Sequence, residues 1–269
     1  MTMESLVNMD KTWLAIAATC HVFAAIVSFW RNRGRFTDLW LSTLMLSAVT
    51  AMFAGLLFRW LRTGQGPFLT LFDVLTSNIF SLGLIYFLLF VSVPRLRTSA
   101  PAALTILGIL GVWALSIPAD PVPLPATFSH SWLWAHVISG KIFLGFAMTG
   151  SSQATMFLFQ ARTDMHRDYA ADDQLLWRIM AVAFLFQSFM LVAGAVWAQD
   201  AWGRFWTWDP LETWAFITWL VLAGVFHLRA TLRLPLWVGW CGVIVVFMLA
   251  FLTFFGLPFF SGAPHKGVF

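Results

Sequence analysis

The residues of this chain that are best suited to chemistry gather in one stretch, WAQDAWGRFWTWDPLETWAFITW, from Trp197 to Trp219. The stretch holds six of the sixteen tryptophans in twenty-three residues, together with Asp200, Asp209 and Glu212. Tryptophan suits a membrane–water boundary because its ring is apolar while its indole N–H is polar. An ordinary interfacial belt uses about one or two such rings at a helix end. Six rings therefore indicate a platform for a large, flat, aromatic ligand.

Two histidines are expected on the same side of the membrane as this stretch. His136 lies about one turn into an apolar helix that begins near Trp132, and His265 lies in the C-terminal tail. Two imidazoles beside an aromatic platform are typical of a bis-histidine clamp for an iron porphyrin, because imidazole nitrogen suits iron and the axial ligands tune it. A zinc site is a weaker interpretation, since no Cys or carboxylate stands at a short ligand spacing from either histidine.

The remaining candidate histidines lie elsewhere. At 1.5 Å per residue, His227 is roughly 25 Å along its helix from Pro210, near the other membrane face, so it cannot join His136 and His265 around one ligand. His21 falls near the middle of the first apolar run, where an imidazole is costly unless it is partnered or faces the bundle. A packed or hydrogen-bonded histidine is the favoured interpretation there, and a ligand is the alternative.

The segment Asp209-Pro210-Leu211-Glu212 has the pattern of a helix start. Asp209 is expected as the N-cap, Pro210 at the first helical position and Glu212 as the residue that completes a capping box. The two carboxylates should then fix the entry angle of the following helix. Trp202 and Trp206 are four residues apart, so a helical turn here would stack their rings on one face.

The composition places these residues in a membrane protein. Hydrophobic residues make up 60% of the 269 residues and charged residues only 10%, and the mean hydropathy of +0.80 lies outside the range of soluble domains. The net charge of +4 comes from sixteen basic residues spread through the chain, which argues against a nucleic-acid-binding patch. Cys20 and Cys241 fall in apolar runs without a CxxC motif, so the chain is not expected to supply thiol chemistry.

A helix needs about 20 apolar residues to cross the hydrocarbon core of a bilayer. Eight runs meet this criterion, at residues 12–30, 37–58, 71–93, 101–117, 132–160, 177–197, 211–229 and 236–257. The predicted fold class is thus an all-α integral membrane protein, a polytopic bundle of about eight transmembrane helices with a tryptophan-rich loop. We expect a single transmembrane helical domain over residues 1–269, with the tryptophan-rich segment 197–219 inside it.

The distribution of lysine and arginine gives the orientation, because short basic loops stay in the cytoplasm. The first, third, fifth and seventh loops hold nine of these residues: Arg31, Arg33, Arg35, Arg95, Arg97, Arg162, Arg167, Arg229 and Arg233. The other side holds five: Lys11, Arg59, Arg62, Arg204 and Lys266. Both termini and the tryptophan-rich loop are therefore expected on the outer side of the membrane, in the periplasm or its equivalent.

The second loop, RWLRTGQGPFLTLFD, combines Arg59, Arg62 and Asp73 with a Gly-Gln-Gly-Pro turn. One interpretation is that the two arginines anchor the chain by snorkelling to the interface. The other is that their guanidinium groups pair with the carboxylates of a bound ligand.

The tryptophan-rich stretch closely resembles the "WWD" signature of the haem-handling membrane proteins. Its Asp-Pro-x-Glu-Thr-Trp portion is more similar to the CcsA/ResC branch of the cytochrome c assembly proteins than to the CcmC branch. The resemblance extends to Trp132-Leu133-x-x-His136-Val137, to His227 and to a histidine in the C-terminal tail, and so covers roughly residues 55–269.

The resemblance implies haem b as the ligand and a part in a cytochrome c haem lyase complex of the System II type. In that family, histidines matching His136 and His265 ligate haem at the outer face, and a histidine matching His227 takes haem from the inner side. A CcsB/ResB-type membrane protein is the implied partner, and the haem is joined to the CxxCH motif of apocytochrome c. The residues implied to present the haem are Trp197, Trp202, Trp206, Trp208, Asp209 and Trp214.

Three places depart from the family's usual pattern. Gln65 stands where relatives often have histidine, Phe72-Asp73 stands where they often have Tyr-Glu, and the residues around His265 differ from Leu-His-Ser-Tyr. A second function from a different class is therefore left open, a non-catalytic b-haem-binding or electron-transfer subunit of a larger membrane complex. A third interpretation is a transporter or structural bundle with a rich aromatic belt.

Overall fold

Eight helices in the described part of the chain are long and apolar enough to cross a membrane. The computed structural model describes residues 3–30, 34–123, 130–163 and 167–256, and the regular elements within these ranges are helical. The predicted fold class, an all-α membrane protein with about eight spans, is confirmed.

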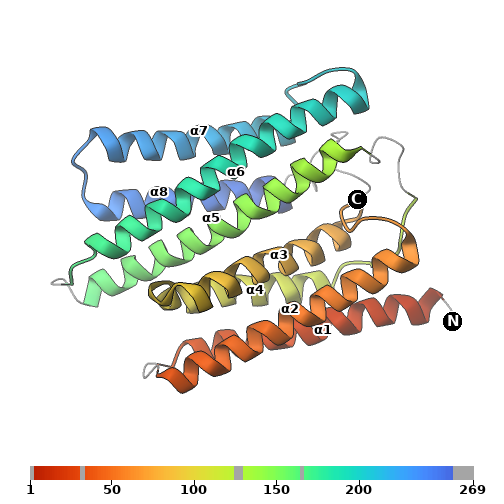
Figure 1. Cartoon of the computed structure of the whole chain (residues 1–269), viewed down its shortest axis with the longest axis horizontal. Helices are drawn as coiled ribbons and strands as arrows, with labels where there is room; N and C mark the ends of the chain where they lie inside the picture. The colour runs from red at the N-terminus through yellow and green to blue at the C-terminus, as the bar shows by residue number, and fades with distance from the viewer. Residues whose placement is uncertain (1–2, 31–33, 124–129, 164–166, 257–269) are drawn as a thin grey trace. The chain divides into compact units, whose positions relative to one another are not determined.

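The helices follow one another along the chain as shown in Figure 1. They are α1 (Met3–Ser28), α2 (Arg35–Thr63), α3 (Leu71–Ser92), α4 (Ala100–Leu115), α5 (Ser131–Thr163), α6 (Ala170–Trp202), α7 (Pro210–Thr231) and α8 (Leu236–Phe251). A 3-10 segment, η1 (Pro94–Ser99), precedes α4, and a short π-helical segment, η3 (Leu252–Gly256), follows α8. Each predicted span has its helix, and the largest difference is in α6, which extends beyond residues 177–197 at both ends.

The helices form two compact units on either side of residues 124–129. We call α1 to α4 the N-terminal unit and α5 to α8 the C-terminal unit, and each is described by itself. A single domain over residues 1–269 stays a prediction.

In the N-terminal unit, α1 packs closely against α2 and α4 because glycines of these two helices face it. A Cβ atom added to Gly55 of α2 would lie 2.8 Å from Cβ of Trp13, and one added to Gly111 of α4 would lie 2.8 Å from Cβ of Ala18. Any larger residue at these two positions would push the helices apart, so the glycines set the spacing of the unit.

His21 is packed inside this unit, as the favoured interpretation predicted. Its side chain is buried, and its Nε2 would lie 3.3 Å from a Cβ added to Gly83 of α3. Neither ring nitrogen has a hydrogen-bond partner among the described residues. The small residue at position 83 is what leaves room for the imidazole between the helices.

A buried arginine joins three helices of the N-terminal unit. Arg59 of α2 donates from Nε to Asp73 of α3 at 2.6 Å, and from Nη1 to Asp10 of α1 at 2.7 Å and to the carbonyl of Ala119 at 2.8 Å. Arg62 also pairs with Asp10, at 2.5 Å. Neither interpretation made from the sequence named these partners: Arg59 is 4% exposed, and its guanidinium is bonded to this chain's own carboxylates.

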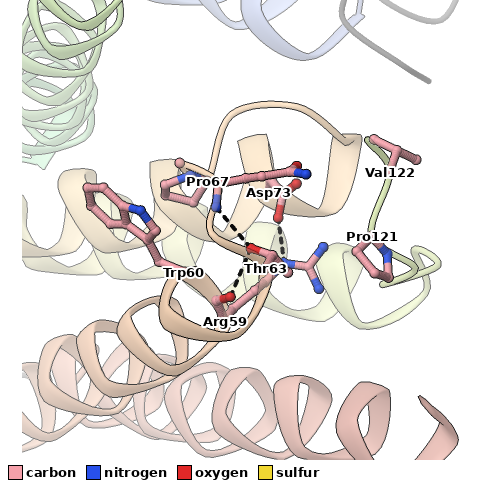
Figure 2. A pocket seen from close by; sticks show the side chains of 9 residues that line it. Arg59, Trp60, Thr63, Pro67, Asp73, Pro121 and Val122 are labelled. Atoms are coloured by element: carbon pink, nitrogen blue, oxygen red, sulfur yellow. Dashed lines mark hydrogen bonds and ion pairs between the residues drawn. The ribbon is translucent and has the colours of Figure 1, made fainter. Parts of the chain in front are cut away.

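Figure 2 shows the recess beside this arginine, where the side chains of Arg59 and Asp73 point toward each other. It is lined by Arg59, Trp60, Thr63, Gln65, Gly66, Pro67, Asp73, Pro121 and Val122. Two arginines and two aspartates offset each other around it, so the cluster carries no net positive charge to attract an anionic ligand. Asp73 also caps α3 through a reciprocal capping box with Thr70, which gives this carboxylate a structural role.

In the C-terminal unit, α5 is the central helix and α7 the least covered. In the apolar stretch that would cross the membrane, 67% of the residues of α5 are buried, and only 22% of those of α7. α5 packs against α6 and α8, and α7 lies against α6 and α8 (Figure 1). The exposed face of α7 is therefore left to lipid or to another protein.

One buried carboxylate holds α6, α7 and α8 together at the end where α6 begins. Asp173 accepts hydrogen bonds from the indole nitrogens of Trp177 at 3.2 Å and Trp240 at 2.9 Å, and pairs with Arg229 of α7 at 2.7 Å. The Arg229 guanidinium also lies over the Trp177 ring, 4.6 Å from its centroid. Because the carboxylate has three partners, its burial is compensated, and the end of α7 is fixed.

We predict that Arg59→Leu destabilises the chain strongly, because it leaves Asp10 and Asp73 buried without their main partner. Breaking one partner of a buried ion pair costs about 3–5 kcal/mol. Thermal unfolding of the purified chain in detergent, followed by far-UV circular dichroism, measures the change. Arg35→Leu, at an exposed position, is the control, and equal midpoints for the two variants would contradict a supporting role for the cluster.

Candidate functional site

The tryptophan-rich segment is mostly helical, and its loop is short. α6 continues through Trp197 to Trp202 and ends where Gly203 adopts a left-handed backbone, with φ of 73° and its N–H donating to the carbonyl of Gln199 at 2.9 Å. α7 begins at Pro210, so the loop is reduced to residues 203–209. We use the name loop end for this loop together with His136 of α5, Trp197 and Trp202 of α6, and the first two turns of α7.

The expectation that Trp202 and Trp206 stack on one helical face is wrong. Gly203 ends the helix between them, so no helical turn spans the two residues. Trp202 instead packs edge-on against Trp197, with ring centroids 4.8 Å apart. Trp206 packs edge-on against Trp208, with ring centroids 5.7 Å apart.

Asp209 caps α7 as predicted, but Glu212 does not complete a capping box. The Asp209 carboxylate accepts the backbone N–H of Glu212 at 2.9 Å. The Glu212 carboxylate reaches further back and accepts from the backbone N–H of Thr207 at 2.7 Å and from its hydroxyl at 3.2 Å. The intervening Trp208 has a left-handed backbone with φ of 59°, which turns the chain so that Thr207 faces the first turn of α7.

Trp208 is the strained residue of the loop. A left-handed conformation costs a residue with a side chain about 1–2 kcal/mol, and the Trp208 side chain is nonetheless 66% exposed. The bonds from Thr207 to buried Glu212 on one side and the Asp209 cap on the other hold this conformation. Strain of this kind gathers at binding sites, where the surrounding structure imposes it.

His136 lies in the second turn of α5 and is held by α6. Its Nδ1 lies 2.9 Å from the carbonyl of Met190. A carbonyl only accepts, so Nδ1 must carry the proton and the lone pair of the neutral ring must be on Nε2. The ring also stacks on Trp197, with centroids 6.1 Å apart and planes at 24°.

Gly194 makes this position possible. A Cβ added to Gly194 would lie 2.6 Å from Nδ1 of His136, closer than any side chain tolerates. α6 therefore presents a gap at residue 194, a carbonyl at Met190 and a ring at Trp197, all to the same imidazole. Met190 and Gly194 were not predicted as part of this site, because no spacing in the chain relates them to His136.

The remaining rings form a second group along α7. Phe216 contacts both Trp206 and Trp208 edge-on, at 6.2 and 6.1 Å between centroids. It also stacks on Trp219 at 5.9 Å with planes 9° apart, and the Trp219 indole N–H donates to the hydroxyl of Ser188 at 2.8 Å. Trp214 is half-buried and has no ring partner among the described aromatic residues.

The structure does not bring His227 to this place. His227 is exposed near the end of α7, two residues before the Arg229 that Asp173 holds. His265 lies outside the described residues. His136, Trp197 and Trp202 thus form one group of contacting rings, and Trp206 and Trp208 belong to another. Asp209 caps α7, and Trp214 lies about one turn into that helix.

A solved structure shares this fold. The chain titled "Cytochrome c Heme Lyase CcmF" superposes with a TM-score of 0.74 over 95% of this chain, at 17% sequence identity. This chain spans about half of that protein, 47% of its length. At this identity the likeness concerns the fold alone.

Among curated relatives, this chain is similar to two proteins named "Cytochrome c biogenesis protein CcsA". The one from Synechococcus sp. (strain RCC307) is 29% identical over 91% of this chain and 93% of its own length. The one from Chlamydomonas reinhardtii is 30% identical over 78% of this chain and 63% of its own length. The family model described as Cytochrome C assembly protein matches residues 13–262. Because that match covers nearly the whole chain, the protein belongs to the cytochrome c assembly protein family.

Proposed function

We propose that this chain binds haem at the loop end of the C-terminal unit and holds it for attachment to apocytochrome c. Membership of the cytochrome c assembly family supports a role in cytochrome c maturation. The observation that carries the finer proposal is the bond from His136 Nδ1 to the Met190 carbonyl, beside a stacked tryptophan. Histidines that bind metals are commonly oriented this way, with the second nitrogen donating to a carbonyl.

The residues at the loop end fit a haem. An iron porphyrin needs an axial nitrogen and flat apolar surfaces, and His136 with Nε2 unprotonated supplies the first. We propose that the rings of Trp202, Trp206 and Trp208 supply the second, since the Trp208 ring is already at the surface, while buried Trp197 supports the His136 ring from behind. By resemblance to the family, His265 is proposed as the opposite axial ligand, and Asp209 and Trp214 as further contacts.

In this proposal the chain positions its substrate and supplies no nucleophile. Each cysteine thiol of the CxxCH motif adds across a haem vinyl group, so that a C–S bond forms and the thiol proton passes to the other vinyl carbon. His136 and the tryptophans hold the haem in one orientation for that addition, which raises the rate by proximity. The fixed loop between Thr207 and Glu212 keeps the rings in place for it.

His227 is proposed as a separate haem ligand at the other end of α7. Its exposure on the least covered helix supports a site completed by another protein, for which we propose a CcsB/ResB-type partner. The cofactor is proposed to be haem b. The basic loops support a bacterial inner membrane topology with the loop end in the periplasm.

We predict that His136→Ala lowers the haem content of the purified chain by about tenfold or more, because the axial nitrogen is lost. Alkaline pyridine spectra measure haem per protein, and added imidazole should restore part of it. His130→Ala, six residues earlier, is the matched control and should keep the native haem content. Unchanged haem in His136→Ala, or native protein that never takes up haem, would contradict the proposal.

The role in maturation is tested in cells that lack the chain. We expect holo-cytochrome c, measured by haem staining of denatured proteins, to fall in such cells. The native chain and His130→Ala should restore it, while His136→Ala should not. Unchanged holo-cytochrome c, with loss of a respiratory activity instead, would favour a haem-binding electron-transfer subunit.

We also predict that Gly194→Ala weakens haem binding by about tenfold, although residue 194 itself bears no ligand. The added methyl group would collide with Nδ1 of His136 and push the ring off the Met190 carbonyl, and loss of such an outer partner costs about 10–100-fold in metal affinity. Haem titration followed by absorbance measures this. Gly224→Ala on α7, where a Cβ meets nothing within 4 Å, is the control, and equal affinities for the two variants would refute the orienting role.

A further inference from the structure

We propose that the indole N–H of Trp206 donates a hydrogen bond to a carboxylate of the bound haem, and so sets which edge of the porphyrin points outward. This inference rests on the proposed function and deepens it. The proposed contact is a hydrogen bond from the indole nitrogen of Trp206, and it is distinct from any stacking of the Trp206 ring on the porphyrin.

The nitrogen of Trp206 is a buried donor with no acceptor among the described residues. Its Nε1 is shielded from solvent, and none of these residues offers it a hydrogen-bond partner. Other indoles of the same unit are bonded: Trp177 and Trp240 donate to Asp173, and Trp219 donates to Ser188. Buried N–H groups are nearly always paired, so an unpaired one indicates an acceptor that arrives from outside the chain.

The position of Trp206 is fixed even though its nitrogen is unpaired. The ring is held edge-on by Trp208 and Phe216. The next residue, Thr207, is tied by two hydrogen bonds to the buried carboxylate of Glu212. The fold therefore keeps an unsatisfied donor in place at a cost in stability, where rotation of a loosely held loop would have relieved it.

In haem, the strong hydrogen-bond acceptors available to the Trp206 N–H are all carboxylate oxygens. The pyrrole nitrogens bind the iron and the vinyl and methyl groups are apolar, so only the two propionate carboxylates accept strong hydrogen bonds. The propionates share one edge of the ring, and the vinyl groups lie away from that edge. A propionate held at Trp206 thus directs the vinyl groups toward the incoming thiols.

Because the Trp206 nitrogen is shielded from solvent, a ligand reaches it only after a neighbouring side chain moves, and we propose that this side chain is Trp208. Its side chain is 66% exposed, and its backbone is in the unfavourable left-handed region. Phe216, by contrast, is held in α7 and stacked on Trp219. Rotation of the Trp208 side chain would open the donor to the carboxylate while the hydrogen bonds of Thr207 and Asp209 keep the backbone in place.

The test compares haemin with its dimethyl ester, in which both carboxylates are blocked. We expect Trp206→Phe, which removes the N–H and keeps a ring, to bind haemin about tenfold more weakly than the native chain, since hydrogen bonds to charged groups are the stronger ones. The native chain and Trp206→Phe should bind the ester equally. Trp219→Phe is the matched control, because its N–H already has Ser188, and it should change both affinities by the same factor.

Stability without ligand gives a second measurement. Because Trp206→Phe removes an unsatisfied donor, we expect its thermal midpoint in the absence of haemin to equal or exceed that of the native chain. If Trp206→Phe loses the same affinity for haemin and for the ester, or has a lowered thermal midpoint, then Trp206 has only a structural role and the inference is overturned. Native-like binding of haemin by Trp206→Phe would overturn it while leaving the proposed function intact. Failure of the native chain to bind either probe would overturn both.

Discussion

The hydrogen bond between His136 and the Met190 carbonyl is the contact on which the loop end depends. It decides which nitrogen of the imidazole carries the proton, and it exists only because Gly194 leaves space for the ring. The same ring stacks on Trp197, so the direction of Nε2 is set by three features of α6 at once. The Nε2 atom is therefore preorganised: it is unprotonated and already points in a fixed direction in the absence of a ligand.

The short loop fixes the positions of Trp206 and Trp208, as α6 fixes the position of His136. Gly203 ends one helix, the Asp209 carboxylate begins the next, and the Glu212 carboxylate ties Thr207 between them. With both ends fixed, Trp208 is forced into a left-handed conformation and its ring out to the surface. The acidic residues therefore act by fixing the backbone, and this fixed backbone leaves the Trp208 ring exposed.

Features that depend on neighbours in the sequence were predictable, and contacts between distant helices were not. The eight spans follow from the length and polarity of each run, and the Asp209 cap follows from a local pattern. The pairing of Trp202 with Trp197 was missed because a single glycine ends α6 one residue later. The burial of Arg59 with Asp10 and Asp73 was missed because these residues come from three helices, and a sequence of charges does not show which of them meet.

The most direct measurement of the central claim is a structure of the chain with haem bound. Our account predicts that the iron is coordinated by Nε2 of His136 while Nδ1 keeps its bond to the Met190 carbonyl, with the porphyrin against the tryptophan rings of the loop end. Coordination through Nδ1, or a haem bound away from His136 with this hydrogen bond intact, would contradict it.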